Sequence, residues 1–396
     1  MRQNDSSGPG EAGPRILAFG AYDTRKPRVR LLLDAIRRAG ALEAEILISV
    51  WSDVPQTKLP LGGTLARVVA RMLLGYPRAV LQLVREGRHL ARTHPGSAVL
   101  LPYPGILEIL LIAPIARLLG LRVILDAFLP IYDTIVGDRS LVERGWRAKA
   151  IWFFERAALR CADIIIVDTD DHGAYYSHEF DLPKARFQTV LVGAEPLFSP
   201  DAPKVAVDDI LGSDDPRPTV LFYGQLIPLH GVLTILEAAR ISDDTAHWVV
   251  IGRGQLEGQV EEYLEEGGEA LARRLTWIKW ADYDALPSII ARADLCLGVF
   301  GASDKASRVI PNKLFQQVAM GKLVITRAGP AVDPIASQFP DAVQTVPADD
   351  PKALANAVAS RLSATGFPEG APEFARIELG PDAGVKALIT KLSDPK

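Results

Sequence analysis

Two cations flank a proline in the C-terminal half of the sequence, where a helix is predicted to begin. They are Arg308 and Lys313, in the segment RVIPNKLFQQVAMGKLVIT around Pro311. Proline favours the start of a helix and glycine the position after its end, so we predict a helix over about 312–320, ended by Gly321. The unpaired N–H groups and the dipole at this helix start attract an anion. A bound anion would explain both cations; the alternative is a solvated lysine on an ordinary strand–helix unit.

Two glycine-containing loops have the composition of phosphate-binding turns. One runs from Gly224 to Gly231 after an apolar segment, and the other is the GRG at 252–254. Because glycine has no side chain, the backbone of such loops can approach a phosphate closely. The first loop contains His230, which would assist in binding a diphosphate if it were protonated; the alternative is a neutral loop histidine.

Acidic residues end two apolar segments of the N-terminal half. Asp126 ends RVILD, and Asp168 ends IIIVD and begins a D-x-D with Asp170. A residue at the carboxyl end of a parallel strand lies at the ligand cleft of an α/β fold, although a strand-end aspartate can also cap the next element. A D-x-D can hold a metal ion between its carboxylates. We interpret this one as helix capping before His172, and we predict no metal site.

The elements that position these residues alternate between strand and helix along the whole chain. Short apolar segments of strand length are followed by segments with helical periodicity, for example 15–20 and then 29–39. Such alternation predicts parallel sheets with right-handed crossovers, which bind ligands at the carboxyl ends of their strands. The first such loop, 21–27, contains Tyr22 and Asp23.

The alternation stops once, in a segment rich in Pro, Asp and Ser, and then restarts. A chain of 396 residues exceeds one ordinary core. We therefore predict an α/β fold with two Rossmann-like domains whose parallel sheets face each other across a cleft. The predicted boundaries are a disordered lead-in (1–14), an N-terminal domain (15–197), a linker (198–217), a C-terminal domain (218–375) and a final helix (376–396) that could pack on either domain.

Composition narrows the class of protein. The sequence is 48% apolar and 23% charged, with two cysteines, which is typical of a soluble globular protein without a disulfide or zinc framework. The N-terminus has no apolar signal segment, and no apolar run is long enough to span a bilayer, so we expect a cytoplasmic protein.

Charge is unevenly distributed. Residues 1–200 contain 25 Lys and Arg against 21 Asp and Glu, whereas the remainder contains 19 against 27. Six arginines lie among apolar residues between 67 and 92. This segment could lie on an anionic membrane surface, peripherally on the inner face of the membrane; the alternative is a solvated face with its apolar side in the core.

From about Val220 to Leu362 the chain resembles the donor-binding domain of the retaining family 4 glycosyltransferases, which have the GT-B fold. The matching segments are YGQLIPLHG, VVIGRG, ARADLCL, PNKLFQQVAMGKLVIT and DDPKALANAV. The first half resembles the acceptor domain more loosely, through ADIIIVDT and VGAEPLF. The resemblance implies transfer of a hexose-like sugar from a UDP-, GDP- or ADP-sugar to a lipid-linked or soluble acceptor with retention of configuration, in glycan, glycolipid or glycoconjugate biosynthesis. It implies no metal and no cofactor.

The chain departs from the family pattern at four positions. The usual Arg and Lys of the first loop are Gln225 and His230, and the usual two Glu are Arg308 and Gln316. The sequence is similar to members that have a Pro-x-Lys helix start, which implies that the cations of the second segment replace those of the first.

The resemblance also implies roles for the candidate residues. Asp126 and His230 would be catalytic, with Asp126 orienting substrate hydroxyls. The expected diphosphate-binding residues are Gly224, Gln225, Gly231, Arg308 and Lys313. The expected ribose- and base-binding residues are Gln316, Gly252, Arg253 and Trp280. Tyr22, Asp23 and Asp133 would lie on the acceptor side.

Two other classes of protein fit parts of the sequence. The lost Arg, Lys and Glu positions favour a non-catalytic nucleotide-sugar-binding protein or partner subunit. A nucleotide-sugar 2-epimerase of the same fold would need carboxylates at the cleft where this chain has Gln316 and Arg308. The acidic C-terminal half, without aromatic residues on a basic strand, argues against binding to nucleic acid.

Overall fold

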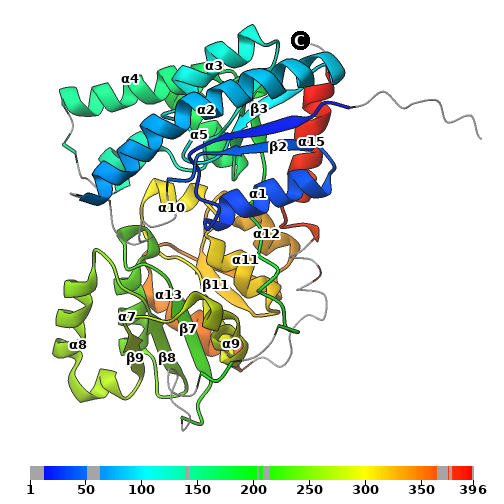
Figure 1. The fold of residues 1–396 in the computed structure, drawn as a ribbon. Coiled ribbons are helices and arrows are strands. Elements are labelled where there is room, and N and C mark those ends of the chain that lie inside the picture. Colours follow the sequence, from blue (N-terminus) through cyan, green and yellow to red (C-terminus); the bar gives the residue numbers. More distant parts are fainter. Residues whose placement is uncertain are drawn as a thin grey trace, which may run out of the picture.

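The computed structural model describes residues 13–50, 63–138, 142–143, 145–202, 205–207, 215–363, 373 and 377–394. Most of the expected disordered lead-in and parts of the expected linker lie outside these residues. The described chain forms two α/β domains, which lie one above the other in Figure 1.

The N-terminal domain contains a six-stranded parallel sheet in the order β2-β1-β3-β4-β5-β6. Its strands are β1 (Ile16–Gly20), β2 (Leu42–Leu47), β3 (Ala98–Leu101), β4 (Arg122–Asp126), β5 (Ile164–Val167) and β6 (Phe187–Thr189). Strands β1, β3 and β5 are apolar and buried throughout, as expected for a parallel sheet covered on both faces.

Helices cover both faces of this sheet. One face packs on α2 (Gly63–Thr93), α3 (Ile109–Leu118), α4 (Trp146–Cys161) and α5 (Asp170–Phe180), and the other on α1 (Pro27–Arg38) and α15 (Asp382–Ser393). A π-helix, η1 (Asp133–Asp138), and a 3-10 turn, η2 (Lys184–Arg186), complete the domain. The π-helix was not predicted.

The C-terminal domain repeats the architecture with the strand order β12-β11-β10-β7-β8-β9, again parallel. Its strands are β7 (Thr219–Tyr223), β8 (His247–Ile251), β9 (Leu275–Ile278), β10 (Leu295–Leu297), β11 (Val324–Arg327) and β12 (Val343–Val346). Its helices are α7 (Val232–Ile241), α8 (Glu257–Ala272), α9 (Leu286–Arg292), α10 (Asp304–Arg308), α11 (Asn312–Ala319), α12 (Asp333–Gln338) and α13 (Pro351–Leu362), with 3-10 turns η3 (Pro228–His230) and η4 (Tyr283–Ala285). The predicted α/β fold with two parallel sheets is confirmed.

The segment around Lys313 folds as predicted, with small shifts at its ends. Helix α11 follows Pro311 and ends one residue earlier than expected, and Gly321 has a left-handed φ of 71°. Every residue of α11 after Asn312 is buried, so this helix lies between the sheet and the rest of the core. The start of α11 is thereby held rigidly at the carboxyl edge of the C-terminal sheet.

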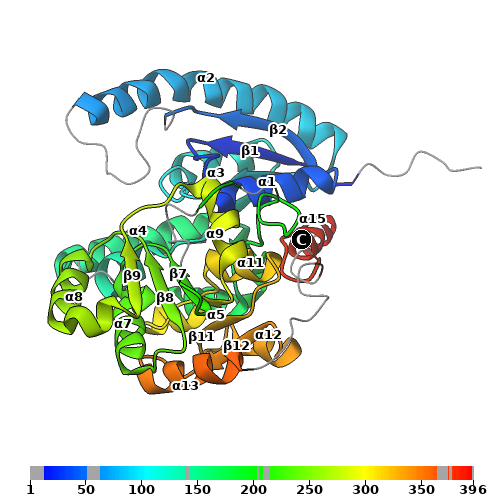
Figure 2. The same cartoon turned by 90° about the horizontal axis from the view of Figure 1, so that it is seen from below.

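The final helix packs on the N-terminal domain. Val385, Leu388 and Leu392 of α15 are buried in the same core as the apolar face of α1. Lys391 Nζ donates a 2.7 Å hydrogen bond to the Phe187 carbonyl at the start of β6. Figures 1 and 2 both show α15 beside α1, so the chain returns from the C-terminal domain to finish the first one.

Candidate active site

Two cavities lie where the carboxyl ends of the two sheets face each other. The first, of about 520 Å³, is lined from the N-terminal side by Phe128–Pro130, Thr134 and Asp168, and from the C-terminal side by Gly224, His230, Lys305, Lys313 and Gln316, among others. The second, of about 970 Å³, is lined by Arg25, Arg30, Gly252, Arg253 and Trp280, among others. Tyr223, Gly224, Gln225 and Tyr283 line both cavities, so the two are neighbours.

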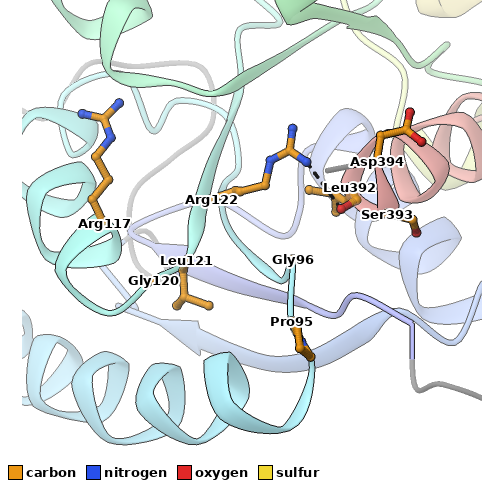
Figure 3. A pocket seen from close by; sticks show the side chains of 9 residues that line it. All are labelled: Pro95, Gly96, Arg117, Gly120, Leu121, Arg122, Leu392, Ser393 and Asp394. Carbon is orange, nitrogen blue, oxygen red and sulfur yellow. Dashed lines mark hydrogen bonds between the residues drawn. The ribbon is translucent and has the colours of Figure 1, made fainter. Parts of the chain in front are cut away.

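A third cavity, of about 530 Å³, lies at the opposite edge of the N-terminal sheet (Figure 3). It is lined by the residues before β3 and β4 and by the end of α15. Arg122 Nη1 donates to the carbonyls of Lys391 and Leu392 there, at 3.0 and 3.4 Å. None of the candidate residues lines this cavity, and we assign it no part in the site.

Lys313 is the central cation of the 520 Å³ cavity. Its side chain is buried, and its Nζ has no hydrogen-bond partner among the residues that the structure describes. The Nζ lies 3.9 Å from the centroid of the Phe222 ring, and this cation–π contact is its one electrostatic partner given by the structure. Burial holds the pKa of the Lys313 ammonium well below its ordinary value.

Glycine is required in the loops around Lys313. A Cβ on Gly224 would lie 2.8 Å from Lys313 Nζ, and Gly224 has a φ of 146°. A Cβ on Gly252 would lie 1.8 Å from the carbonyl oxygen of Gly224, so the two predicted glycine loops touch each other. Gly231 is different, because it lines neither cavity. A Cβ there would strike the backbone of Phe300 and Gly301, so this glycine serves loop packing.

His230 is held in a neutral state. Its Nδ1 is hydrogen-bonded to the carbonyl of Gln225. Burial, and then the neighbouring Lys313, hold the pKa of His230 well below its ordinary value. Of the two alternatives, the structure therefore favours a neutral histidine. A neutral imidazole that donates from Nδ1 presents a lone pair at Nε2.

Gln316 belongs to a buried polar network. Its Oε1 accepts from the Tyr223 hydroxyl at 2.9 Å, and its Nε2 donates to the Tyr283 hydroxyl at 3.0 Å. The Tyr283 hydroxyl in turn donates to Glu195, which is paired with Arg30. Burial raises the pKa of Tyr283 to about 12, so this phenol stays protonated. Gln316 lines the 520 Å³ cavity, but both ends of its amide are already engaged.

Arg308 does not join Lys313. Its Nη2 lies 3.0 Å from Asp133 Oδ2, and its guanidinium stacks on the Tyr175 ring at 4.2 Å. It lines neither cavity. Arg308 and Asp133 were expected to be a diphosphate ligand and an acceptor-side residue; the structure instead pairs them across the two domains.

Asp126 is buried beneath the cleft. Arg28 Nη2 contacts Asp126 Oδ1 at 2.8 Å, and Arg28 Nη1 donates to the carbonyl of Val190. Both side chains are almost fully buried, and Asp126 lines neither cavity. The expected catalytic role therefore has no support in its position, because its charge is neutralised by Arg28. The pair fixes α1 to the carboxyl end of β4.

Of the remaining predicted residues, some line the 970 Å³ cavity and the others lie in the loop after β1. Arg253 and Trp280 are exposed and line the 970 Å³ cavity with Gly252. Tyr22 is buried, with its hydroxyl 3.4 Å from Glu45 Oε2, and Asp23 bonds Arg25. Neither Tyr22 nor Asp23 lines a cavity.

Two cavity residues, Lys305 and Thr134, were missed from the sequence, and a third, Asp168, was interpreted only as a helix cap. Lys305 Nζ donates to Thr134 Oγ1 at 2.8 Å across the cleft, and Asp168 lies beside them on the cavity wall. Asp168 does not cap α5; Thr169 does, by accepting from His172 N at 3.1 Å. The spacing of Asp168 and His172, four residues apart, is the signal that could have identified the pair. Among the described residues no cluster of three His, Cys, Asp or Glu side chains is arranged to hold a metal ion.

Two parallel sheets that meet at a cationic cleft define the GT-B class of folds, and solved structures agree. HepE from Anabaena, in complex with UDP, is 11% identical with a TM-score of 0.59, covering 96% of each chain. Sucrose-phosphate synthase from Thermosynechococcus elongatus is 17% identical with a TM-score of 0.61, covering 96% of each chain. WaaG, described as a glycosyltransferase involved in lipopolysaccharide biosynthesis, is 16% identical with a TM-score of 0.59, covering 96% of this chain and 100% of WaaG. The chain has the GT-B fold of these proteins.

One family model matches part of the sequence, and that part is the C-terminal domain. Residues 217–364 match the family model described as "Glycosyl transferases group 1". No curated protein matches the sequence. The matched segment contains Gly224, His230, Lys313 and Gln316, so the cationic wall of the 520 Å³ cavity belongs to it.

Proposed function

We propose that this protein is a glycosyltransferase that moves a sugar from a nucleoside diphosphate sugar to an acceptor. The observation that carries the proposal is Lys313, whose buried amino group has no hydrogen-bond partner in the described chain and lies on a cavity wall at the start of α11. A buried cation without a partner is costly, and an anion that enters the cavity removes the cost. The match of this segment to a glycosyltransferase family supports a sugar-bound diphosphate as the anion.

The cavity residues can act on the leaving group. Negative charge grows on the departing diphosphate, and a preorganised cation in a dry site stabilises that charge most strongly. Lys313 supplies the charge, and the free N–H groups at the start of α11 add the helix dipole. The exposed Arg253 and Trp280, with Gly252, line the neighbouring 970 Å³ cavity, which is large enough for a nucleoside.

The test is a thermal-shift panel of UDP, GDP and ADP with their sugars, each with and without EDTA. A ligand that binds the folded state raises the midpoint of unfolding by mass action. We expect one diphosphate family to raise it, with no effect of EDTA, because we propose that no metal or cofactor takes part. No shift with any of them would contradict the proposal. Hydrolysis or transfer of the bound donor separates an enzyme from a non-catalytic nucleotide-sugar binder or partner subunit.

We also propose that the transfer retains the anomeric configuration, as in the family 4 enzymes with a Pro-x-Lys helix start. The support is the similarity of residues 311–324 to that pattern. The product is expected in a glycan, glycolipid or other glycoconjugate. Proton NMR of the first product formed gives the anomeric configuration, and an inverted product would contradict this assignment.

We propose a peripheral site of action, on an anionic membrane surface. None of the described helices is long and apolar enough to span a bilayer. The outer face of α2 instead alternates leucine and arginine: Leu74, Arg78, Leu81, Arg85, Arg88 and Arg92 are all exposed. Within the described chain, none of these four arginines pairs with a carboxylate. Such a helix can lie in the plane of a membrane surface.

Two other helices on the same face of the sheet also expose large apolar side chains. Figure 1 shows α2, α3 and α4 over the same face of the N-terminal sheet. Leu111 and Leu118 of α3 are 54% and 89% exposed, and Trp146 and Phe153 of α4 are 75% and 62% exposed. A surface that combines leucine, tryptophan and arginine is complementary to the boundary between acyl chains and anionic headgroups.

A further inference from the structure

The carboxylate residue Asp168 belongs to the wall of the 520 Å³ cavity. It directly follows β5 and is 4% exposed. Among the described residues that line the two neighbouring cavities, it is the single carboxylate. The other charged residues of these walls are cations, among them Lys305 and Lys313 in the same cavity. A lone carboxylate in a cationic cavity is not needed for binding a diphosphate, which it would repel.

The carboxylate is held in one orientation. Its Oδ1 lies 2.6 Å from His172 Nδ1. The His172 ring stacks on Tyr176, with ring centroids 4.9 Å apart, and the Tyr176 hydroxyl donates to the Ala127 carbonyl at 3.1 Å. His172 Nε2 is buried without a partner in the described chain, so the bond to Asp168 is the one hydrogen bond of the imidazole. Orientation is therefore built into the fold before any ligand binds.

The second carboxylate oxygen remains available. Oδ2 of Asp168 has no hydrogen bond to any residue that the structure describes, and Asp168 lines the cavity. A carboxylate oxygen only accepts hydrogen bonds, and it accepts them more strongly than a neutral group does. The partner that suits Oδ2 is thus an O–H or N–H group of a ligand.

Asp168 is also fixed relative to Lys313 on the opposite wall. The hydroxyl of its neighbour Thr169 donates to the backbone carbonyl of Arg308, in the segment that leads into α11. The Arg308 side chain bonds Asp133 in the N-terminal domain. The first contact joins the residue after Asp168 to the segment that precedes Lys313, and the second joins η1 of the N-terminal domain to the same segment.

We propose that Asp168 binds a hydroxyl group of the transferred sugar through Oδ2. This inference rests on the proposed function. Lys313 and Asp168 line one cavity, so a diphosphate at Lys313 brings its attached sugar into the same space. The negative wall repels the phosphates and receives hydroxyls, which orients the donor along the cavity. Asp168 thereby takes the hydroxyl-orienting role that the sequence had assigned to Asp126, with His172 as the positioning residue.

The experiment compares binding of a bare nucleoside diphosphate with binding of its sugar conjugates. Titration calorimetry on the full chain uses UDP with UDP-glucose, UDP-galactose and UDP-N-acetylglucosamine, GDP with GDP-mannose, and ADP with ADP-glucose. For D168N we expect the affinity for the nucleoside diphosphate to stay within about twofold of wild type. Affinity for the preferred sugar conjugate should fall about tenfold or more, as for loss of a charge-assisted hydrogen bond.

The control is Asp171→Asn, which removes the same charge three residues further along the chain, in α5, from a side chain that lines neither cavity. It should leave all affinities unchanged. Unchanged affinity for the sugar conjugate in D168N, or an equal loss for conjugate and bare diphosphate, would overturn the proposal. If D168N does not fold, Asp168→Ser repeats the test with a smaller side chain. Failure of the proposed function has a different result, because wild type would then bind none of the three diphosphates.

Discussion

The burial of Lys313 should reduce the stability of the folded protein, and the proposed binding of an anion would explain why the lysine is there. Its ammonium is buried beside Phe222, with no hydrogen-bond partner in the described chain. The next lysine of the same segment is a contrast, because Lys322 Nζ donates to the carbonyls of Ala291 and Ala293 at 2.8 and 2.7 Å. The two side chains are chemically identical. They differ because Lys322 has two carbonyl acceptors, whereas Lys313 has no hydrogen-bond acceptor in the described chain.

Replacing Lys313 by methionine should stabilise the folded protein and weaken its binding of a diphosphate. Removing a buried group without a partner should raise the free energy of unfolding by about 1–3 kcal/mol. Binding of the diphosphate found in the thermal-shift panel should weaken about ten- to hundredfold, because a charged hydrogen bond is lost. Urea unfolding and titration calorimetry measure the two effects. Lys322→Met is the control, and it should destabilise the protein without changing the affinity.

The lowered pKa of Lys313 predicts that diphosphate binding takes up protons. Burial favours the neutral amine in the free protein, whereas a diphosphate beside Nζ favours the ammonium. Between the pKa of the free protein and the higher pKa of the complex, binding must therefore add a proton, and affinity must fall as pH rises. His230, whose pKa is also lowered, extends the uptake to lower pH.

Calorimetry in buffers of different ionisation enthalpy measures this uptake. Wild type should show a positive proton uptake that Lys313→Met reduces, and identical heats in all buffers would rule the mechanism out. The same linkage acts on folding. The unfolded chain binds more protons than the folded chain, so stability should rise as pH increases toward the ordinary pKa of lysine.

At the residue scale, the sequence predicted which side chains are charged but not which of them are neutralised. Lys313 and Gln316, which the pattern around Pro311 had singled out, both line the 520 Å³ cavity. Asp126 has the same strand-end position as Asp168, and the difference between them comes from Arg28, which is distant in sequence. Long-range pairing of this kind leaves no local signal.

At the scale of elements, α2 has two faces of different character. Its inner face packs through Leu83 and Leu90 in the domain core, while its outer face presents leucine and arginine to solvent. The periodicity predicted both faces. It could not show that α3 and α4, on the same face of the sheet, expose Leu118 and Trp146, because that depends on the order of the strands.

Neutralising the outer face of α2 should release the protein from anionic vesicles. Each arginine near such a surface contributes about 1 kcal/mol, so changing Arg78, Arg85 and Arg88 to glutamine should weaken partitioning on the order of a hundredfold. Sedimentation with vesicles of phosphatidylglycerol and phosphatidylcholine measures it. A matched triple change of Lys184, Arg186 and Lys386, away from this face, should have little effect. Wild type that never sediments with these vesicles would refute the membrane assignment.

At the scale of the whole molecule, contacts between the domains close the cleft. Arg308 bonds Asp133, Lys305 bonds Thr134, and the Thr169 hydroxyl bonds the Arg308 carbonyl. The sequence predicted both domains and the cleft from the alternation of strands and helices. From the sequence, we expected Arg308 and Asp133 to bind ligands separately. Their ion pair depends on how the two domains are arranged, and the pattern of either domain alone does not indicate that arrangement.

Arg308→Gln should loosen the closed arrangement without removing the phosphate site. Arg308 lines neither cavity, so the affinity for a nucleoside diphosphate should change less than about threefold, in contrast to Lys313→Met. The radius of gyration from small-angle X-ray scattering should increase, and Asp133→Asn should reproduce the increase. A loss of affinity as large as that of Lys313→Met would restore Arg308 as a direct ligand.

Because α15 packs on the N-terminal domain, the fold of that domain can be completed only after the C-terminal domain has been synthesised. Val385, Leu388 and Leu392 fill a core whose other members begin at Ile16. The N-terminal domain is consequently synthesised before the C-terminal domain but completed after it, because one face of its sheet waits for α15. At roughly 5–20 residues per second, that wait lasts on the order of ten seconds or more. Truncation near the C-terminus would therefore leave the newly made N-terminal domain as a client for chaperones, while residues 217–364 could still fold as a unit.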